Sequence, residues 1–76
     1  GLSRLNILNL HNNNNLRVIP DLSNLENLII LRIDKYHCLQ GTLPNDNLQI
    51  YEYEGDTDTL INNNNNKLCP TTTPSG

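Results

Sequence analysis

The segment "NLENLIILRIDKYHCLQGTLP" (residues 24–44) decides the fold, because its apolar residues follow two spacings in turn. Leu25, Leu28 and Leu31 recur at every third position, and the interval then shortens to two between Leu31 and Ile33. A helix places apolar residues three and four apart, whereas a strand with one buried face places them at every second position. Neither spacing persists, so the segment requires a structure that alternates between the two.

The same spacing occurs three times, as L-x-x-L-x-L or its apolar equivalent. The three copies are Leu5-Leu8-Leu10, Leu28-Leu31-Ile33 and Leu48-Tyr51-Tyr53. Their first residues are 23 and then 20 positions apart, and each of the first two copies closes with a leucine (16 and 39) and a proline (20 and 44). Periods of this length are typical of repeat proteins, in which neighbouring units stack and bury one continuous core.

Together with the Gly-x-Leu-Pro that closes the second copy, this pattern resembles the leucine-rich repeat family, in its extracellular, plant-receptor-like variety. The resemblance covers residues 2–69. It implies a small right-handed α/β solenoid with little helix, in which the tight spacing forms a strand and the wide spacing forms the turn on the convex side. We therefore expect a three-stranded parallel sheet, with strands at about Ile7–Leu10, Ile30–Ile33 and Ile50–Tyr53.

The end of the chain is similar to the family's C-terminal cap, where an asparagine-rich stretch leads into Leu68 and Cys69. We expect a solenoid fragment over residues 1–69, followed by a Thr/Pro-rich tail over residues 70–76. The chain begins at Gly1 without a methionine, so we also expect a processed protein or an excised fragment.

The chain departs from the family pattern in the loop after each strand. There the family uses an asparagine side chain to bond the loop backbone. Asn13 fits in the first copy, but Tyr36 and Asp56 occupy the matching positions of the other two. On the convex side, "SNLE" (residues 23–26) fits a capping box for one helical turn, with an irregular arc as the alternative.

If the apolar residues of each copy face inward, the residues between them face outward on the concave side. These outward positions form three columns: Ile7, Ile30 and Ile50; Asn9, Arg32 and Glu52; His11, Asp34 and Glu54. An apolar column beside mixed charge is typical of a protein-binding surface. The alternative is that the isoleucines serve only strand formation and cross-strand packing.

The two cysteines, Cys38 and Cys69, bear on the compartment. Joined with His11 and His37 they would supply four zinc ligands, but the spacing matches no zinc pattern. We predict a Cys38–Cys69 disulfide, which indicates an extracellular or cell-surface protein. Two unrelated buried thiols are the alternative.

Composition excludes several classes of function. A net charge of −3 with no clustered basic face argues against nucleic acid, and no apolar run is long enough for a membrane span. Glu52, Glu54, Asp56 and Asp58 suggest paired carboxylates, but without a deep pocket nothing would raise the pKa of one and make it a general acid. Residues 54–58 alternate oxygen ligands as calcium prefers but lack a full twelve-residue loop. We expect no catalysis, metal or cofactor.

Two polar segments remain. The asparagine runs, Asn12–Asn15 and Asn62–Asn66, are typical of low-complexity insertions, yet they stand where loops belong and asparagine tolerates left-handed backbone. The tail places its hydroxyl residues among prolines, which predicts O-glycosylation, with a plain linker as the alternative. These residues are Thr71, Thr72, Thr73 and Ser75.

Two classes of function follow from the pattern. The first is a non-enzymatic recognition module that binds a protein ligand through its concave sheet. The alternative is a structural subunit of an extracellular fibre or coat, whose copies assemble head-to-tail through uncapped solenoid ends and carry a glycosylated tail.

Overall fold

The computed structural model describes residues 4–13 and 15–70. In this part of the chain short strands alternate with turns, and helix is almost absent. The elements are β1 (Ile7–Asn9), β2 (Val18–Ile19), β3 (Ile30–Asp34), β4 (Cys38–Leu39), β5 (Gln49–Glu54), β6 (Thr57–Leu60) and the 3-10 helix η2 (Asn64–Lys67).

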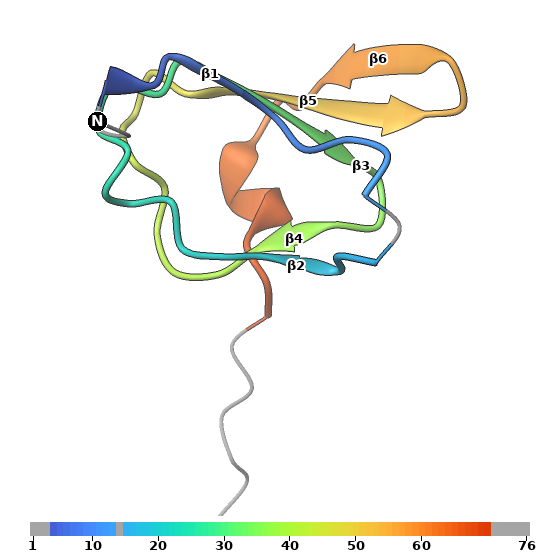
Figure 1. The fold of residues 1–76 in the computed structure, drawn as a ribbon, viewed down its shortest axis with the longest axis horizontal. Helices are drawn as coiled ribbons and strands as arrows, with labels where there is room; N and C mark the ends of the chain where they lie inside the picture. The colour runs from blue at the N-terminus through green and yellow to red at the C-terminus, as the bar shows by residue number, and fades with distance from the viewer. Residues whose placement is uncertain (1–3, 14, 71–76) are drawn as a thin grey trace, which may run out of the picture.

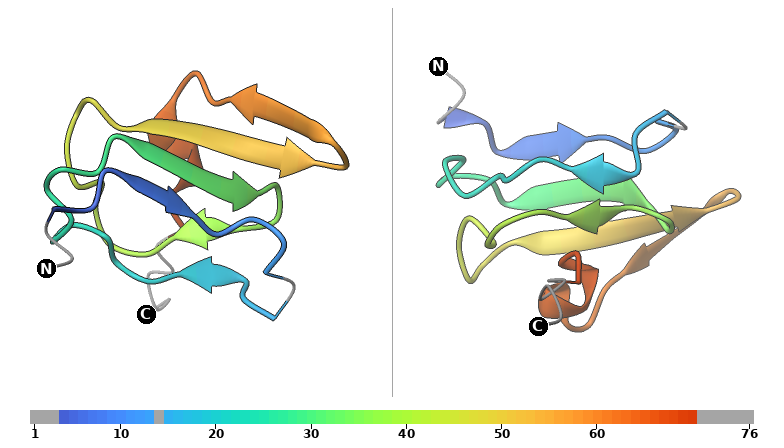
Figure 2. Two further views of the ribbon diagram at one scale, coloured as in Figure 1. Left: turned by 45° about the horizontal axis from the view of Figure 1, so that its top comes forward. Right: turned by 90° about the horizontal axis from the view of Figure 1, so that it is seen from below.

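The strands form two sheets that lie on opposite sides of the core (Figure 1). The larger sheet has the order β1-β3-β5-β6, and the smaller one pairs β2 with β4. Strands β1, β3 and β5 are parallel, as the repeat predicts, because the chain crosses to the other side of the molecule and back between them (Figure 2). The predicted parallel sheet is confirmed, whereas its fourth strand, β6, antiparallel to β5, was not expected.

The core between the two sheets is small and aliphatic. Its buried side chains are Ile19, Leu28, Leu31, Ile33, Leu39, Leu48 and Ile50. Further leucines pack against them while remaining partly exposed, among them Leu5, Leu8 and Leu10 of the first copy. Full burial of one such side chain contributes about 1.5–3 kcal/mol, so each member carries a large share of the stability of so small a chain.

The predicted third strand, Ile50–Tyr53, lies within β5, but its predicted register against β3 is wrong by one residue. In the structure Leu31 lies opposite Ile50 and Arg32 lies opposite Tyr51. Ile50 is therefore a fully buried core residue and not an outward one. Because successive side chains of a strand point to opposite faces, a register shift of one residue moves every inward side chain to the outer face and every outward one to the core.

The same shift changes the predicted face of Glu52 and Glu54, which were expected to point outward with Ile50. Glu52 lies on the inner side, where its carboxylate pairs with the Lys67 ammonium of η2 at 2.7 Å. Glu54 belongs to the same set but lies beyond the core, at the exposed end of β5. The outward positions of β5 are Gln49, Tyr51 and Tyr53.

The convex arc at residues 22–28 is irregular and forms no helix. Of the two alternatives for this segment, the structure therefore has the irregular arc and not the capped helical turn. The Ser23 N–H donates to the Asp21 carboxylate at 2.8 Å and forms a local turn. Two further turns follow, closed by the Leu25 N–H on the Leu22 carbonyl and by the Leu28 N–H on the Leu25 carbonyl.

Three asparagine side chains donate to backbone carbonyls next to the strands. Asn13 donates to the Leu10 carbonyl at 2.7 Å, as expected for the first copy. The other two contacts are to carbonyls just before β3 and β5. Asn45 donates to the Leu28 carbonyl at 2.9 Å, and Asn64 donates to the Leu48 carbonyl at 2.6 Å. The amides therefore join each pass of the chain to the one before it.

The described residues of the two asparagine runs lie in turns and in the short helix η2. Asn12 has a left-handed backbone with a φ of 66°. In the second run, the Asn63 side chain accepts the Asn65 N–H at 3.1 Å and so begins η2.

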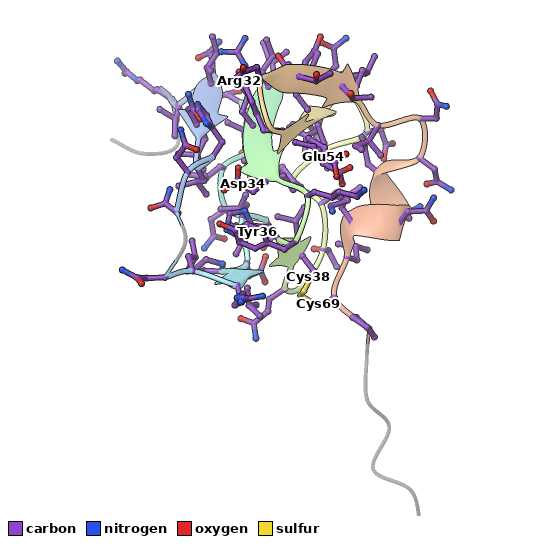
Figure 3. All side chains as sticks on the ribbon, turned by 90° about the vertical axis from the view of Figure 1, so that its right-hand side faces the viewer. Arg32, Asp34, Tyr36, Cys38, Glu54 and Cys69 are labelled. Carbon is purple, nitrogen blue, oxygen red and sulfur yellow. A yellow bond between two sulfur atoms is a disulfide. The ribbon has the colours of Figure 1, made fainter. Side chains whose placement is uncertain are left out.

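The predicted disulfide between Cys38 and Cys69 is present (Figure 3). It ties β4 to the segment that follows η2, across a sequence separation of 31 residues. The Cys69 N–H also donates to the Leu39 carbonyl at 2.8 Å, and Leu68 forms a parallel bridge with Leu39. Leu68 and Cys69 are thereby held against the smaller sheet.

The Gly-x-Leu-Pro motif begins with a glycine because a side chain does not fit at that position. Gly41 has a φ of 76°, and a Cβ added there would overlap the carboxylate of Asp21 on the preceding pass of the chain. Hydrogen bonds, first from the Ser23 backbone, then from its side chain and from Thr42, hold the pKa of Asp21 below its usual value.

We predict that Gly41→Ala lowers the free energy of unfolding by about 1–3 kcal/mol, because left-handed backbone is strained for a residue with a Cβ and the new methyl group meets Asp21. Urea denaturation measures this loss. Gly55→Ala is the matched control, since Gly55 also has a positive φ of 63° but open space around its Cβ position. A Gly41→Ala loss no larger than that of Gly55→Ala would contradict the role of the close contact.

Candidate functional site

The candidate site is the outer face of the large sheet, defined as the side chains of β1, β3, β5 and β6 that point away from the core. The strand register aligns these side chains in three rows. The rows are Ile7, Ile30 and Gln49; Asn9, Arg32, Tyr51 and Leu60; Asp34, Tyr53 and Asp58.

Six of the nine residues predicted for this face lie on it or at its edge, and three do not. Those present are Ile7, Asn9, His11, Ile30, Arg32 and Asp34. Ile50, Glu52 and Glu54 are replaced by Gln49, Tyr51 and Tyr53. The sequence held a signal for the correct register, because Leu48 and Ile50 are aliphatic residues two positions apart.

Arg32 lies at the centre of the outer face, on the middle strand of the three parallel ones. Its guanidinium carbon is 6.0 Å from the ring centre of Tyr51, a cation–π geometry. Its Nε is buried and has no hydrogen-bond partner in the described part of the chain. An unpaired buried donor costs free energy, which is recovered if the guanidinium turns on binding so that a ligand supplies the acceptor.

Asp34 closes the C-terminal end of β3 and is almost fully buried. Its carboxylate accepts the Asn12 N–H at 2.7 Å and the Tyr36 hydroxyl at 3.1 Å, so it fixes the loop after β1 and the turn after β3. Burial, and next the hydrogen bond to Asp34, raise the pKa of Tyr36 and keep its hydroxyl protonated as the donor.

His11 and Tyr53 meet across the end of β3. Their rings stack with centroids 4.1 Å apart and planes inclined by 14°. Since Tyr53 lies opposite Asp34 on β5 and His11 follows β1 on the other side, the stack spans the strand that carries Asp34. No local pattern in the sequence signals this pairing.

Two hollows of about 470 Å³ lie at opposite ends of the strands. The hollow at the C-terminal ends, here called the tyrosine hollow, is lined by Asn12, Asp34, Lys35, Tyr36, Tyr53, Glu54 and Gly55. The hollow at the N-terminal ends is lined by Arg4, Asn6, Glu26, Asn27, Ile29, Asn45 and Asn47. Figure 3 shows Arg32, Asp34 and Tyr36 in succession along β3 and its following turn, with Glu54 beside them.

His37 is a buried residue that the sequence did not single out as structural. Its Nδ1 accepts the Asp34 N–H at 3.0 Å, which closes the turn between β3 and β4, while its Nε2 has no hydrogen-bond partner among the described residues. The neighbouring Cys38 is in the disulfide and offers no thiolate, so the two do not form a nucleophile and base.

The described residues include no group of three or more His, Cys, Asp or Glu side chains placed to hold a metal ion. Within residues 4–13 and 15–70, no helix is long and apolar enough to cross a membrane. The four residues predicted to carry sugar, Thr71, Thr72, Thr73 and Ser75, lie outside the described residues.

Comparisons of the chain with protein-family models, with curated proteins and with solved structures found no match. The resemblance to leucine-rich repeats therefore rests on the spacing of residues in the sequence and stays a prediction.

Proposed function

We propose that the chain is an extracellular recognition module of the leucine-rich-repeat type, which binds a protein ligand through the outer face of the large sheet and performs no catalysis. The observation that carries this proposal is Arg32, a guanidinium at the centre of the face with a buried, unpaired Nε beside the Tyr51 ring.

The composition of the outer face supports the proposal. Arginine and tyrosine are the residues most often found at the centre of binding surfaces, where they contribute most of the affinity. Around Arg32 and Tyr51 lie the exposed apolar side chains of Ile7 and Leu60. The disulfide is consistent with an extracellular setting, where such bonds persist.

A peptide-display selection on the folded chain tests this function. Peptides selected for binding should lose affinity by about tenfold or more on Arg32→Ala, the effect typical of a central interface residue. Arg32→Lys should lose part of the affinity, because an ammonium lacks the planar donors of the guanidinium.

Val18→Ala is the matched control, since Val18 is an exposed apolar residue of β2 on the opposite sheet. Its substitution should leave the affinity unchanged. Selected peptides that bind Arg32→Ala as tightly as the unmodified chain, or that lose affinity on Val18→Ala instead, would contradict the proposal.

The structural role, as a subunit that assembles head-to-tail, is a second candidate. In the described part of the chain, β1 and β6 are the two edges of the large sheet. The pass that contains β1 carries Arg4 and Arg17, whereas the β5–β6 hairpin carries acidic residues and no lysine or arginine. A contact between unlike ends does not close on itself and extends into a fibre. Light scattering separates the two roles, because a folded monomer at high concentration excludes assembly.

A further inference from the structure

We propose that the tyrosine hollow accepts a basic side chain, an arginine guanidinium or a lysine ammonium, from the protein that binds the outer face. This inference rests on the proposed function and names the chemistry of one group of the partner. The hollow adjoins the outer face because Asp34 and Tyr53 belong to both.

The walls of the hollow are aromatic and already fixed in place. Tyr53 is held by its stack with His11, and Tyr36 is held by the hydrogen bond from its hydroxyl to Asp34. The faces of such rings attract cations through their quadrupole. Because Arg17 already lies over Tyr36, 5.3 Å from the ring centre, we expect Tyr53 to be the ring that contacts the incoming cation.

The charge of the hollow also favours a cation. Its lining includes the carboxylates of Asp34 and Glu54 against the single ammonium of Lys35. The hairpin beside it also carries Asp56 and Asp58, and it holds no lysine or arginine. These charges add to a negative potential that attracts cations. A carboxylate or phosphate ligand would instead meet two carboxylates and an ammonium that is already paired.

Lys35 is the resident cation of the hollow, and its pairing is weak. Its ammonium is 3.0 Å from the Glu54 carboxylate, and the two side chains are 60% and 71% exposed. The hydrogen bond and the charge of Glu54 raise the pKa of Lys35, which remains protonated at neutral pH. Exposed pairs of this kind stabilise little, so an incoming cation can replace Lys35 on Glu54 at low cost.

Contacts between a cation and a tyrosine ring occur twice within the described part of the chain. Arg17 lies over Tyr36, and Arg32 lies over Tyr51. Tyr53 stacks on the ring of His11 and borders the hollow, whose lining includes the carboxylates of Asp34 and Glu54. An arginine or lysine of a partner would complete a third pairing of this type.

A titration of the isotopically labelled chain with methylguanidinium chloride, followed by amide NMR, tests the inference. Sodium chloride at equal ionic strength is the reference. We expect saturable shifts at the amides of residues 34–36 and 53–55 that the reference salt does not produce.

Two variants with opposite expected effects separate binding in the hollow from loss of folding. Lys35→Gln should tighten methylguanidinium binding by about two- to fivefold, because Glu54 is left unpaired, and Glu54→Gln should weaken it by a similar factor. Asp46→Asn is the matched control, since it removes one negative charge from an exposed position that does not line the hollow. It should change the affinity by less than either variant.

The inference is overturned if methylguanidinium produces only the shifts of sodium chloride, or if Lys35→Gln and Glu54→Gln change the affinity in the same direction. Its failure is distinct from failure of the proposed function. Selected peptides that depend on Arg32 while the hollow ignores cations would reject the inference alone. Cations that bind the hollow while selected peptides ignore Arg32 would reject the outer face as the binding surface.

Discussion

Replacing Leu31 by alanine should lower the free energy of unfolding by about 2–5 kcal/mol, the range for truncating a fully buried aliphatic side chain. Leu31 is fully buried on the middle strand of the parallel sheet, between Leu8 on β1 and Ile50 on β5. The loss combines the transfer free energy of the removed atoms with the cavity left behind. In so small a chain it approaches the whole stability, so equilibrium urea denaturation should find the variant largely unfolded.

Two further variants keep this prediction measurable. Ile33→Val removes a single methylene from another fully buried core residue and should cost about 0.5–1.5 kcal/mol. Ile29→Ala, at a neighbouring position that is 47% exposed, should cost much less. Equal losses for Leu31→Ala and Ile29→Ala would contradict the inward orientation of Leu31.

Removing the disulfide is the second large effect. Cys38→Ser with Cys69→Ser should lower the free energy of unfolding by about 3–4 kcal/mol, because the bond closes a loop of about thirty residues in the unfolded chain. The double variant and the reduced natural chain should have the same denaturation midpoint, since both lose the same constraint.

The reduced chain is the control for any packing effect of the serine side chains. A double variant less stable than the reduced natural chain would assign part of the loss to packing. Two free thiols in the natural chain by mass spectrometry, or an unchanged midpoint after reduction, would contradict the stabilising role of the bond.

The strands β1 and β3 could be predicted because their inward positions are all aliphatic. Leu8 and Leu10 in one, and Leu31 and Ile33 in the other, leave no second choice of face. Each predicted strand lies within one residue of the observed one at either end. The burial of these alternating residues therefore dominates the local structure.

The register of β5 could not be read in the same way. Tyrosine is apolar along its ring and polar at its hydroxyl, so Tyr51 and Tyr53 fit either face of a strand. In the structure the tyrosines lie outward and Ile50 fills the core between the sheets. The register is decided by which side chain fills the core beside Leu31, and this depends on the neighbouring strand and not on the sequence of β5 alone.

Strand β6 has no hydrophobic period because all four of its residues are exposed. Its signal was the turn: Gly55 and Asp56 separate the two strands, and Gly55 adopts a φ of 63°. A glycine at the first central position of a two-residue turn is typical of a type II′ hairpin.

The tyrosine hollow depends on contacts between residues far apart in the chain. His11 reaches Tyr53, Lys35 reaches Glu54, and Asp34 holds Asn12. Spacing along the sequence placed His11 and Asp34 in one column but carried no information about side-chain conformations. The rings of Tyr36 and Tyr53 were consequently missed as parts of a site.

The NMR signal of the Arg32 Nε–H, recorded with a peptide selected on the folded chain, tests whether the outer face is the binding surface. If the outer face is the binding surface, this proton should shift as it gains an acceptor, together with the amides of β3 and β5. A complex in which the Arg32 Nε–H signal is unchanged while the amides of β2 and β4 shift would contradict binding at the outer face.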